Sequence, residues 1–218
     1  MSDRPEEGDS SQSFVRIGLI FYGAMAALAV LWRMGFHGEP ILYASEADAT
    51  RGLALGRDLA LGLTAGGLVV AASNLATRYT DWGEDLARAM GEVLGQISTP
   101  NAVLLAFASG MAEEMLFRGA LQPRVGLVLA SLIFGCIHFV PRRVFLPWTV
   151  FAVLIGGLLG WLFLWTGNLV APIAAHTLVN AINLPLLIRR YGSGASSADR
   201  SRAEDSADDP SDEGGHGD

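Results

Sequence analysis

Two adjacent carboxylates, Glu113 and Glu114, interrupt an apolar stretch of helix length, residues 102–117. An ionisable side chain at the centre of a bilayer costs about 2.5 kcal/mol or more, so an acidic pair in such a stretch indicates a functional site. Arg118 follows Glu114 by four residues, the spacing at which an acid that precedes a base pairs best on a helix. We therefore predict that Arg118 neutralises Glu114. Glu113, about 100° around the helix, is then left to act as a base.

Two of the four histidines, His138 and His176, fall in other apolar stretches. Asn180 lies four residues after His176, so both side chains project from one helix face and can donate hydrogen bonds to a developing oxyanion. Phe134, one turn before His138, is predicted to flank its ring. A rise of about 1.5 Å per residue places the acid, the histidines and the amide at similar depths. These depths are compatible with one shared site. The alternative is that the two acids and Arg118 form a packing network without catalysis.

The elements that position these groups are predicted to be membrane-spanning helices. Apolar residues make up 51% of the chain, and no charged residue occurs between Val144 and Ile188. A helix needs about 20 mainly apolar residues to cross a bilayer. We predict an all-α polytopic membrane helix bundle with an amphipathic interfacial helix over residues 81–97. Its six spans are expected at residues 14–32, 59–77, 102–122, 125–140, 146–165 and 169–188.

The formal net charge of −7 resides in the ends of the chain. Residues 1–13 and 191–218 are predicted to be disordered acidic tails that flank a membrane domain over residues 14–190. No basic footprint for nucleic acid is present.

The chain has no lysine, and the distribution of its arginines favours both termini in the cytoplasm. Abundant Arg, Ala and Gly favour a bacterial source, so we expect a multi-pass protein of the inner membrane with the lipid bilayer as a partner.

Other residues are given structural roles. Cys136 is predicted to pack in a span, and three tryptophans, Trp148, Trp161 and Trp165, are predicted to anchor spans at the membrane interface. Seven glycines are expected to permit close helix packing. These are Gly23, Gly62, Gly66, Gly67, Gly156, Gly157 and Gly160.

Three motifs together resemble those of the CPBP family, the CAAX proteases and bacteriocin-processing enzymes also called the Abi family. They are E-E-x-x-x-R at Glu113 to Arg118, F-x-x-x-H at Phe134 to His138 and H-x-x-x-N at His176 to Asn180. The similarity covers residues 81–187 and includes "FRGALQP" after the acids and "FGCIH" around the first histidine. Each motif alone is weak evidence, whereas all three in order within apolar spans are a strong signal.

The resemblance implies an intramembrane glutamic endopeptidase without a metal cofactor. Glu113, helped by His138, would activate a water, while His176 and Asn180 would stabilise the tetrahedral oxyanion. The substrate would be a membrane-associated protein or peptide. A bacterial role in C-terminal processing or sorting of exported proteins, as in the myxosortase-like branch, is favoured over cleavage of prenylated peptides.

Two alternatives remain open. In the first, Glu113, His138 and His176 bind a catalytic zinc, which commonly has three protein ligands and one open position. In the second, the chain is a non-catalytic bacteriocin-immunity or partner-binding membrane protein of the same family.

Overall fold

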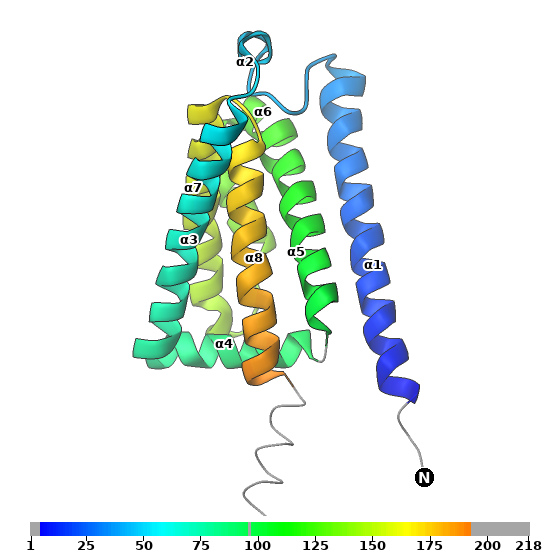
Figure 1. The fold of residues 1–218 in the computed structure, drawn as a ribbon, viewed down its shortest axis with the longest axis vertical. Coiled ribbons are helices and arrows are strands. Elements are labelled where there is room, and N and C mark those ends of the chain that lie inside the picture. Colours follow the sequence, from blue (N-terminus) through cyan, green and yellow to red (C-terminus); the bar gives the residue numbers. More distant parts are fainter. Residues whose placement is uncertain (1–4, 96, 193–218) are drawn as a thin grey trace, which may run out of the picture.

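The computed structural model describes residues 5–95 and 97–192, and helices are the dominant structure of this part of the chain. The predicted all-α bundle is confirmed (Figure 1). The helices are α1 (Pro5–Val30), η1 (Leu31–Phe36), α2 (Glu46–Arg51), α3 (Leu55–Tyr79), α4 (Asp81–Leu94), α5 (Thr99–Glu114), η2 (Met115–Leu121), α6 (Gln122–Ile137), η3 (Arg143–Phe145), α7 (Leu146–Thr166) and α8 (Val170–Tyr191). Segments η1 and η2 are π-helical, and η3 is a 3₁₀-helix.

Five helical stretches of the described residues are long and apolar enough to cross a membrane. One of them, Thr99–Ile137, spans 39 residues and contains a reversal at Gly126, which has φ of 83°. We predicted two spans here, and the chain does turn back, but α6 runs on from η2 without a loop. Two predicted spans, residues 102–122 and 125–140, thus fall in one continuous helical stretch, and length and composition give five candidate spans where six were predicted.

Large apolar side chains cover the outside of the bundle, as a bilayer requires. Leu68 on α3, Val128 on α6 and Leu154 on α7 are 66–72% exposed. Such a density of exposed apolar side chains is rare on soluble proteins and typical of a surface that contacts lipid. The chain is a multi-pass membrane protein.

Helix α4 lies across one end of the bundle, roughly perpendicular to the spans (Figure 1). Thr80 caps it by accepting a hydrogen bond from the amide of Gly83, and it ends before Gly95, whose φ is 60°. The helix packs against α3 and α8. The predicted interfacial helix over residues 81–97 is thus present, three residues shorter than expected. The start of α1 and the end of α8 lie at this same end (Figure 1).

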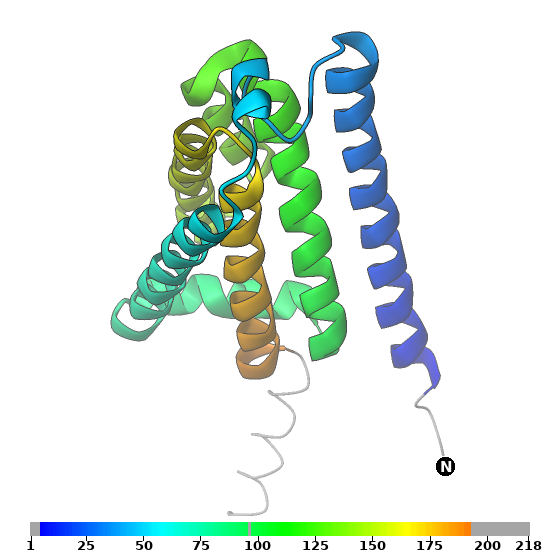
Figure 2. The same cartoon turned by 45° about the horizontal axis from the view of Figure 1, so that its top comes forward.

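The two edges of the bundle are formed by α1 and α3. Helix α1 packs against α5 and η2, whereas α3 packs against α8 and α4 (Figure 2).

Helical structure in α1 begins at Pro5, inside the segment predicted to be an N-terminal tail. The predicted C-terminal tail lies outside the described residues from position 193 onward. Cys136 is exposed on α6, so its predicted packing role is wrong.

Glycines on one face of α3 let it approach α8 closely. A Cβ on Gly62 or Gly66 would meet the backbone of Ala171 or Ala175. Gly156 and Gly160 on α7 are likewise in close contact, so the packing role predicted for these four glycines is confirmed. For Gly23, Gly67 and Gly157 that prediction is wrong, since a Cβ there would meet nothing within 4 Å.

A buried carboxylate fixes the start of α8. Asp58 on α3 is fully buried, pairs with Arg57 and accepts a hydrogen bond of 2.7 Å from Nδ2 of Asn168. The side-chain oxygen of Asn168 in turn accepts the amide of Val170 at 2.9 Å. These contacts satisfy a free amide at the helix N-terminus and hold α8 two turns before His176.

We predict that Gly62→Ala destabilises the bundle by about 1–3 kcal/mol, because the added methyl group would push α3 away from α8. The matched control is Gly67→Ala, whose new methyl group has open space. Thermal unfolding of both variants in detergent measures the difference. Equal midpoints for the two variants would show that close packing at Gly62 does not hold these helices together.

Candidate active site

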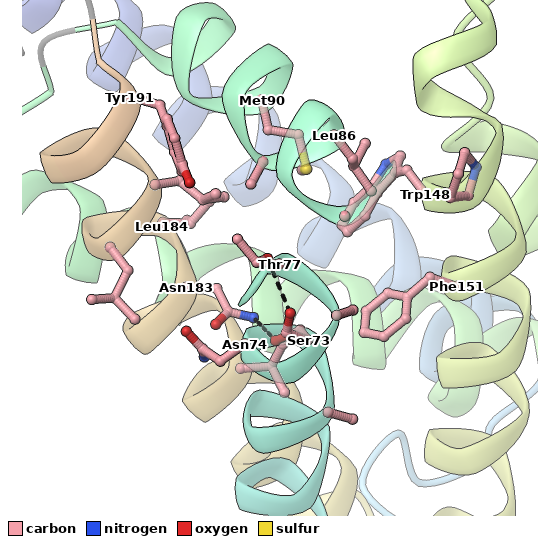
Figure 3. Close-up of a pocket in the computed structure, with 18 of the residues that line it drawn as sticks. Ser73, Asn74, Thr77, Leu86, Met90, Trp148, Phe151, Asn183, Leu184 and Tyr191 are labelled. Carbon is pink, nitrogen blue, oxygen red and sulfur yellow. Dashed lines mark hydrogen bonds between the residues drawn. The ribbon is translucent and has the colours of Figure 1, made fainter. Parts of the chain in front are cut away.

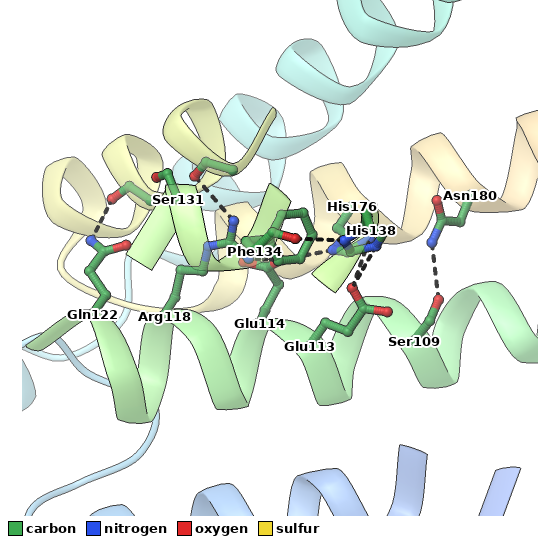
Figure 4. Close-up of polar contacts among 12 residues, drawn as sticks. Ser109, Glu113, Glu114, Arg118, Gln122, Ser131, Phe134, His138, His176 and Asn180 are labelled. Atoms are coloured by element: carbon green, nitrogen blue, oxygen red, sulfur yellow. Dashed lines mark hydrogen bonds and ion pairs between the residues drawn. The ribbon is translucent and has the colours of Figure 1, made fainter. Parts of the chain in front are cut away.

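The acidic pair sits where α5 gives way to the π-helical segment η2. Glu114 is fully buried, and its Oε1 lies 2.8 Å from a guanidinium nitrogen of Arg118, which is also buried. A second Arg118 nitrogen donates to the carbonyl of Gly156 on α7 at 3.1 Å, and the guanidinium lies 4.5 Å from the ring centroid of Phe134. The pairing predicted between Glu114 and Arg118 is therefore present, and it ties η2 to α6 and α7 (Figure 4).

Glu114 also holds the second histidine. Its Oε1 lies 2.7 Å from Nδ1 of His176 on α8. Because Glu114 is the carboxylate partner of Arg118, it accepts this hydrogen bond, and Nδ1 of His176 therefore carries the proton. Nε2 is left to face the interior of the site.

The first histidine is oriented in the same manner. Nδ1 of His138 lies 2.7 Å from the carbonyl oxygen of Phe134, which can only accept, so Nδ1 is again the donor. The Phe134 ring lies 4.6 Å from the His138 ring and 6.0 Å from the His176 ring, between centroids. The flanking position predicted for Phe134 is thus present, and one aromatic side chain packs against both imidazoles.

Glu113 faces both histidines. Its Oε2 lies 3.9 Å from Nε2 of His138 and 4.0 Å from Nε2 of His176. The three side chains converge from α5, from the residue that follows α6 and from α8 (Figure 4). Oε2 is buried and has no protein hydrogen-bond partner among the described residues. Buried carboxylate oxygens are as a rule hydrogen-bonded. Separations near 4 Å are too long for direct hydrogen bonds and suit a small molecule that contacts all three atoms.

Asn180 lies one turn beyond His176 on α8, and its nearest polar partner is Ser109. The Nδ2 of Asn180 donates to Oγ of Ser109 at 3.0 Å. An amide nitrogen has two hydrogens, so the second remains for a ligand. Ser109 is itself buried and donates to the carbonyl of Ala106. Ser109 therefore fixes the orientation of Asn180 from α5.

The structure brings Ser109 and Trp148 to this site, and neither was predicted to belong to it. Ser109 lies four residues before Glu113, so helical spacing alone could have placed it on the same face. Trp148 was predicted to be an interface anchor, which stays a prediction, and its ring also lies 5.7 Å from that of His138. The π-helical turn had no sequence signal; such turns are frequent at functional sites.

Comparison with known proteins identifies the relationship of this region. Residues 95–182 match the family described as Type II CAAX prenyl endopeptidase Rce1-like. The resemblance to CAAX proteases is confirmed. The matched segment contains the acidic pair, Arg118, Phe134, both histidines and Asn180.

A curated relative supports the same relationship. Over 93 residues the chain is 41% identical to "Uncharacterized protein YpbD" of Bacillus subtilis (strain 168). That alignment covers 42% of this chain and 48% of the relative, so the chain spans about half the length of the relative it matches. No solved structure matches the chain.

We predict that Arg118→Met destabilises the protein by about 3–5 kcal/mol, because it leaves Glu114 buried without its main counter-charge. The matched control is Arg88→Met, which breaks an exposed pair with Glu84 at the same four-residue spacing and should cost at most about 1 kcal/mol. Thermal unfolding in detergent compares the two. A similar small loss in both variants would mean that the buried pair does not hold the site together.

Proposed function

We propose that this protein is an intramembrane endopeptidase that hydrolyses a peptide bond in a membrane-associated protein or peptide. The observation that carries the proposal is the convergence of Glu113 Oε2 and two imidazole Nε2 atoms, within 4.0 Å, inside a helical membrane bundle. The family to which residues 95–182 are similar is described as an endopeptidase. These facts support a hydrolytic site for a substrate that reaches it from the bilayer.

In the proposed reaction, Glu113 takes a proton from a water molecule as the water oxygen bonds to the scissile carbonyl carbon. His138 holds that water through Nε2. The electron pair of the carbonyl double bond moves to its oxygen, which His176 and Asn180 stabilise by donating hydrogen bonds. His176 can donate from Nε2 only as an imidazolium, because its Nδ1 proton is held by Glu114. The carbon–nitrogen bond then breaks, and the proton on Glu113 passes to the leaving amine.

A zinc-dependent hydrolase is the second candidate. Both histidines donate from Nδ1 to an oxygen acceptor, as zinc-bound histidines commonly do, and both neutral rings would present an unprotonated Nε2. As placed, however, the described residues include no group of three His, Cys, Asp or Glu side chains that could hold a metal ion. The separations near 4 Å between Glu113 and the two imidazoles support activation of water by the side chains themselves. A carboxylate and two histidines are also common zinc ligands, so a zinc-dependent hydrolase remains the alternative.

We expect Glu113→Gln to abolish proteolysis, since the amide cannot accept the proton of the attacking water. The measurement is quantitative proteomics of peptide termini in membranes from cells that carry either the wild type or the variant. Termini that depend on the protein should disappear in Glu113→Gln and persist in the control Glu92→Gln, which changes an exposed residue of α4. Termini that persist unchanged in a correctly folded Glu113→Gln protein would contradict the mechanism.

We expect the purified enzyme to keep its activity after exhaustive chelation. The assay would follow cleavage of a substrate found by the proteomic comparison, in enzyme whose zinc content has been measured by mass spectrometry. Activity that disappears with the metal and returns with added zinc would replace the proposed mechanism with the zinc-dependent one.

The cellular setting belongs to the same proposal. We infer an inner-membrane protein with both termini in the cytoplasm, which acts on exported or membrane-anchored proteins. The shared location of the described ends of α1 and α8 at one end of the bundle supports an even number of passes. The distribution of arginines supports the cytoplasmic side.

A further inference from the structure

A cavity of about 340 Å³ lies between α3, α4, α7 and α8 (Figure 3). It adjoins the candidate active site through two residues that line it. Trp148 contacts the ring of His138, and Asn180 follows His176 by one turn. A molecule in this cavity would therefore contact Trp148 and Asn180, which border the site, whereas Glu113 and the two imidazoles do not line the cavity.

Most of the wall is apolar, with side chains from α4, α7 and α8 such as Leu86, Met90, Trp148, Phe151 and Leu184 (Figure 3). Arg190, at the end of α8, is the charged side chain among the described residues that line it. Away from Arg190, a ligand that fills the cavity is thus uncharged and largely apolar.

One side of the cavity is polar. Ser73, Asn74 and Thr77 on α3 face Asn183 on α8, and Nδ2 of Asn183 donates to Oγ of Ser73 at 3.1 Å. Nδ2 of Asn74 donates to the carbonyl of Val70 at 2.9 Å. Hydrogen bonds inside the protein thus engage the amide nitrogen of each asparagine, and among the described contacts neither Oδ1 accepts one. Two side-chain carbonyl groups therefore remain as acceptors beside an apolar wall.

An extended peptide has matching chemistry. Water can attack a peptide carbonyl only when the backbone is released from its own helical hydrogen bonds, and inside a membrane the released N–H groups need new acceptors. Asn74 and Asn183 supply such acceptors, whereas an acyl or isoprenoid chain would have no use for them. The four polar residues also lie outside residues 95–182, so the family relationship assigns them nothing.

We propose that this cavity binds an extended, uncharged, apolar peptide segment next to the scissile bond, and that Asn183 and Asn74 accept hydrogen bonds from its backbone amides. The inference rests on the proposed function and names its substrate class. The segment would carry apolar side chains toward α4 and α7 and its backbone toward α3.

The test measures binding apart from hydrolysis. Full-length Glu113→Gln protein in lipid nanodiscs is titrated with a dansyl-labelled, end-capped peptide of Ala, Val and Leu, and energy transfer from Trp82 and Trp148 in the cavity reports saturable binding. A set of otherwise identical peptides replaces one backbone amide at a time by an ester. At one or more positions the ester should weaken binding by about 3- to 10-fold, the size expected for one lost hydrogen bond.

The decisive comparison is the same set of peptides with Asn183→Leu added to Glu113→Gln. In this double variant, amide and ester peptides should bind equally well. Asn74→Leu serves as a second variant should Asn183→Leu not fold. The matched control is Asn101→Leu at the start of α5, away from the cavity, which should keep the full dependence. Equal binding of amide and ester peptides to the parent protein, or equal binding of a peptide with a central aspartate, would overturn the inference.

Different results would contradict the proposed endopeptidase and the proposed peptide site. Ester-dependent binding without any hydrolysis by the wild type supports the cavity as a peptide site and contradicts the endopeptidase. Hydrolysis by the wild type without dependence on Asn183 or Asn74 supports the endopeptidase and contradicts this cavity as its peptide site.

Discussion

One buried ionic network organises the centre of this protein. Arg118, Glu114 and His176 meet within hydrogen-bond distance, and Arg118 also binds the carbonyl of Gly156. In a bundle surrounded by lipid, each of these groups would be costly without the others. The network therefore fixes the relative positions of η2, α7 and α8.

The same network leaves Glu113 to perform chemistry. Arg118 is engaged by Glu114, and among the described residues Glu113 forms no ion pair with an arginine and faces the two imidazoles. Phe134 packs against both rings and under the guanidinium, which keeps the groups apart at fixed distances. Asp58 and Asn168 hold the start of α8, so the position of His176 depends on contacts at the end of the bundle as well as at its centre.

Much of this arrangement could be predicted from spacing. The separation of four positions from Glu114 to Arg118 predicted their pairing, and the apolar runs predicted the bundle. The two spans predicted on either side of Pro123 form one continuous helical stretch, because α6 follows η2 without a loop and Gln122, Pro123 and Arg124 lie in the first turn of α6. The contact of Asn180 with Ser109 and that of Trp148 with His138 depend on how α5, α6, α7 and α8 pack against one another, which residue patterns along single helices do not encode. The polar side of the cavity was not predicted for the same reason, since Ser73 and Asn183 lie on neighbouring helices that are far apart in the sequence.

In the proposed mechanism each imidazole donates from Nδ1 and presents Nε2 to Glu113. Nitrogen-15 NMR of histidine-labelled protein in nanodiscs tests this directly, because the chain has only four histidines. Substitution of His138 and of His176 by Gln assigns the two signals. We expect a protonated Nδ1 in both rings, and we expect the His176 signal to shift in Glu114→Gln. A neutral ring that carries its proton on Nε2, in either histidine, would contradict the proposed mechanism.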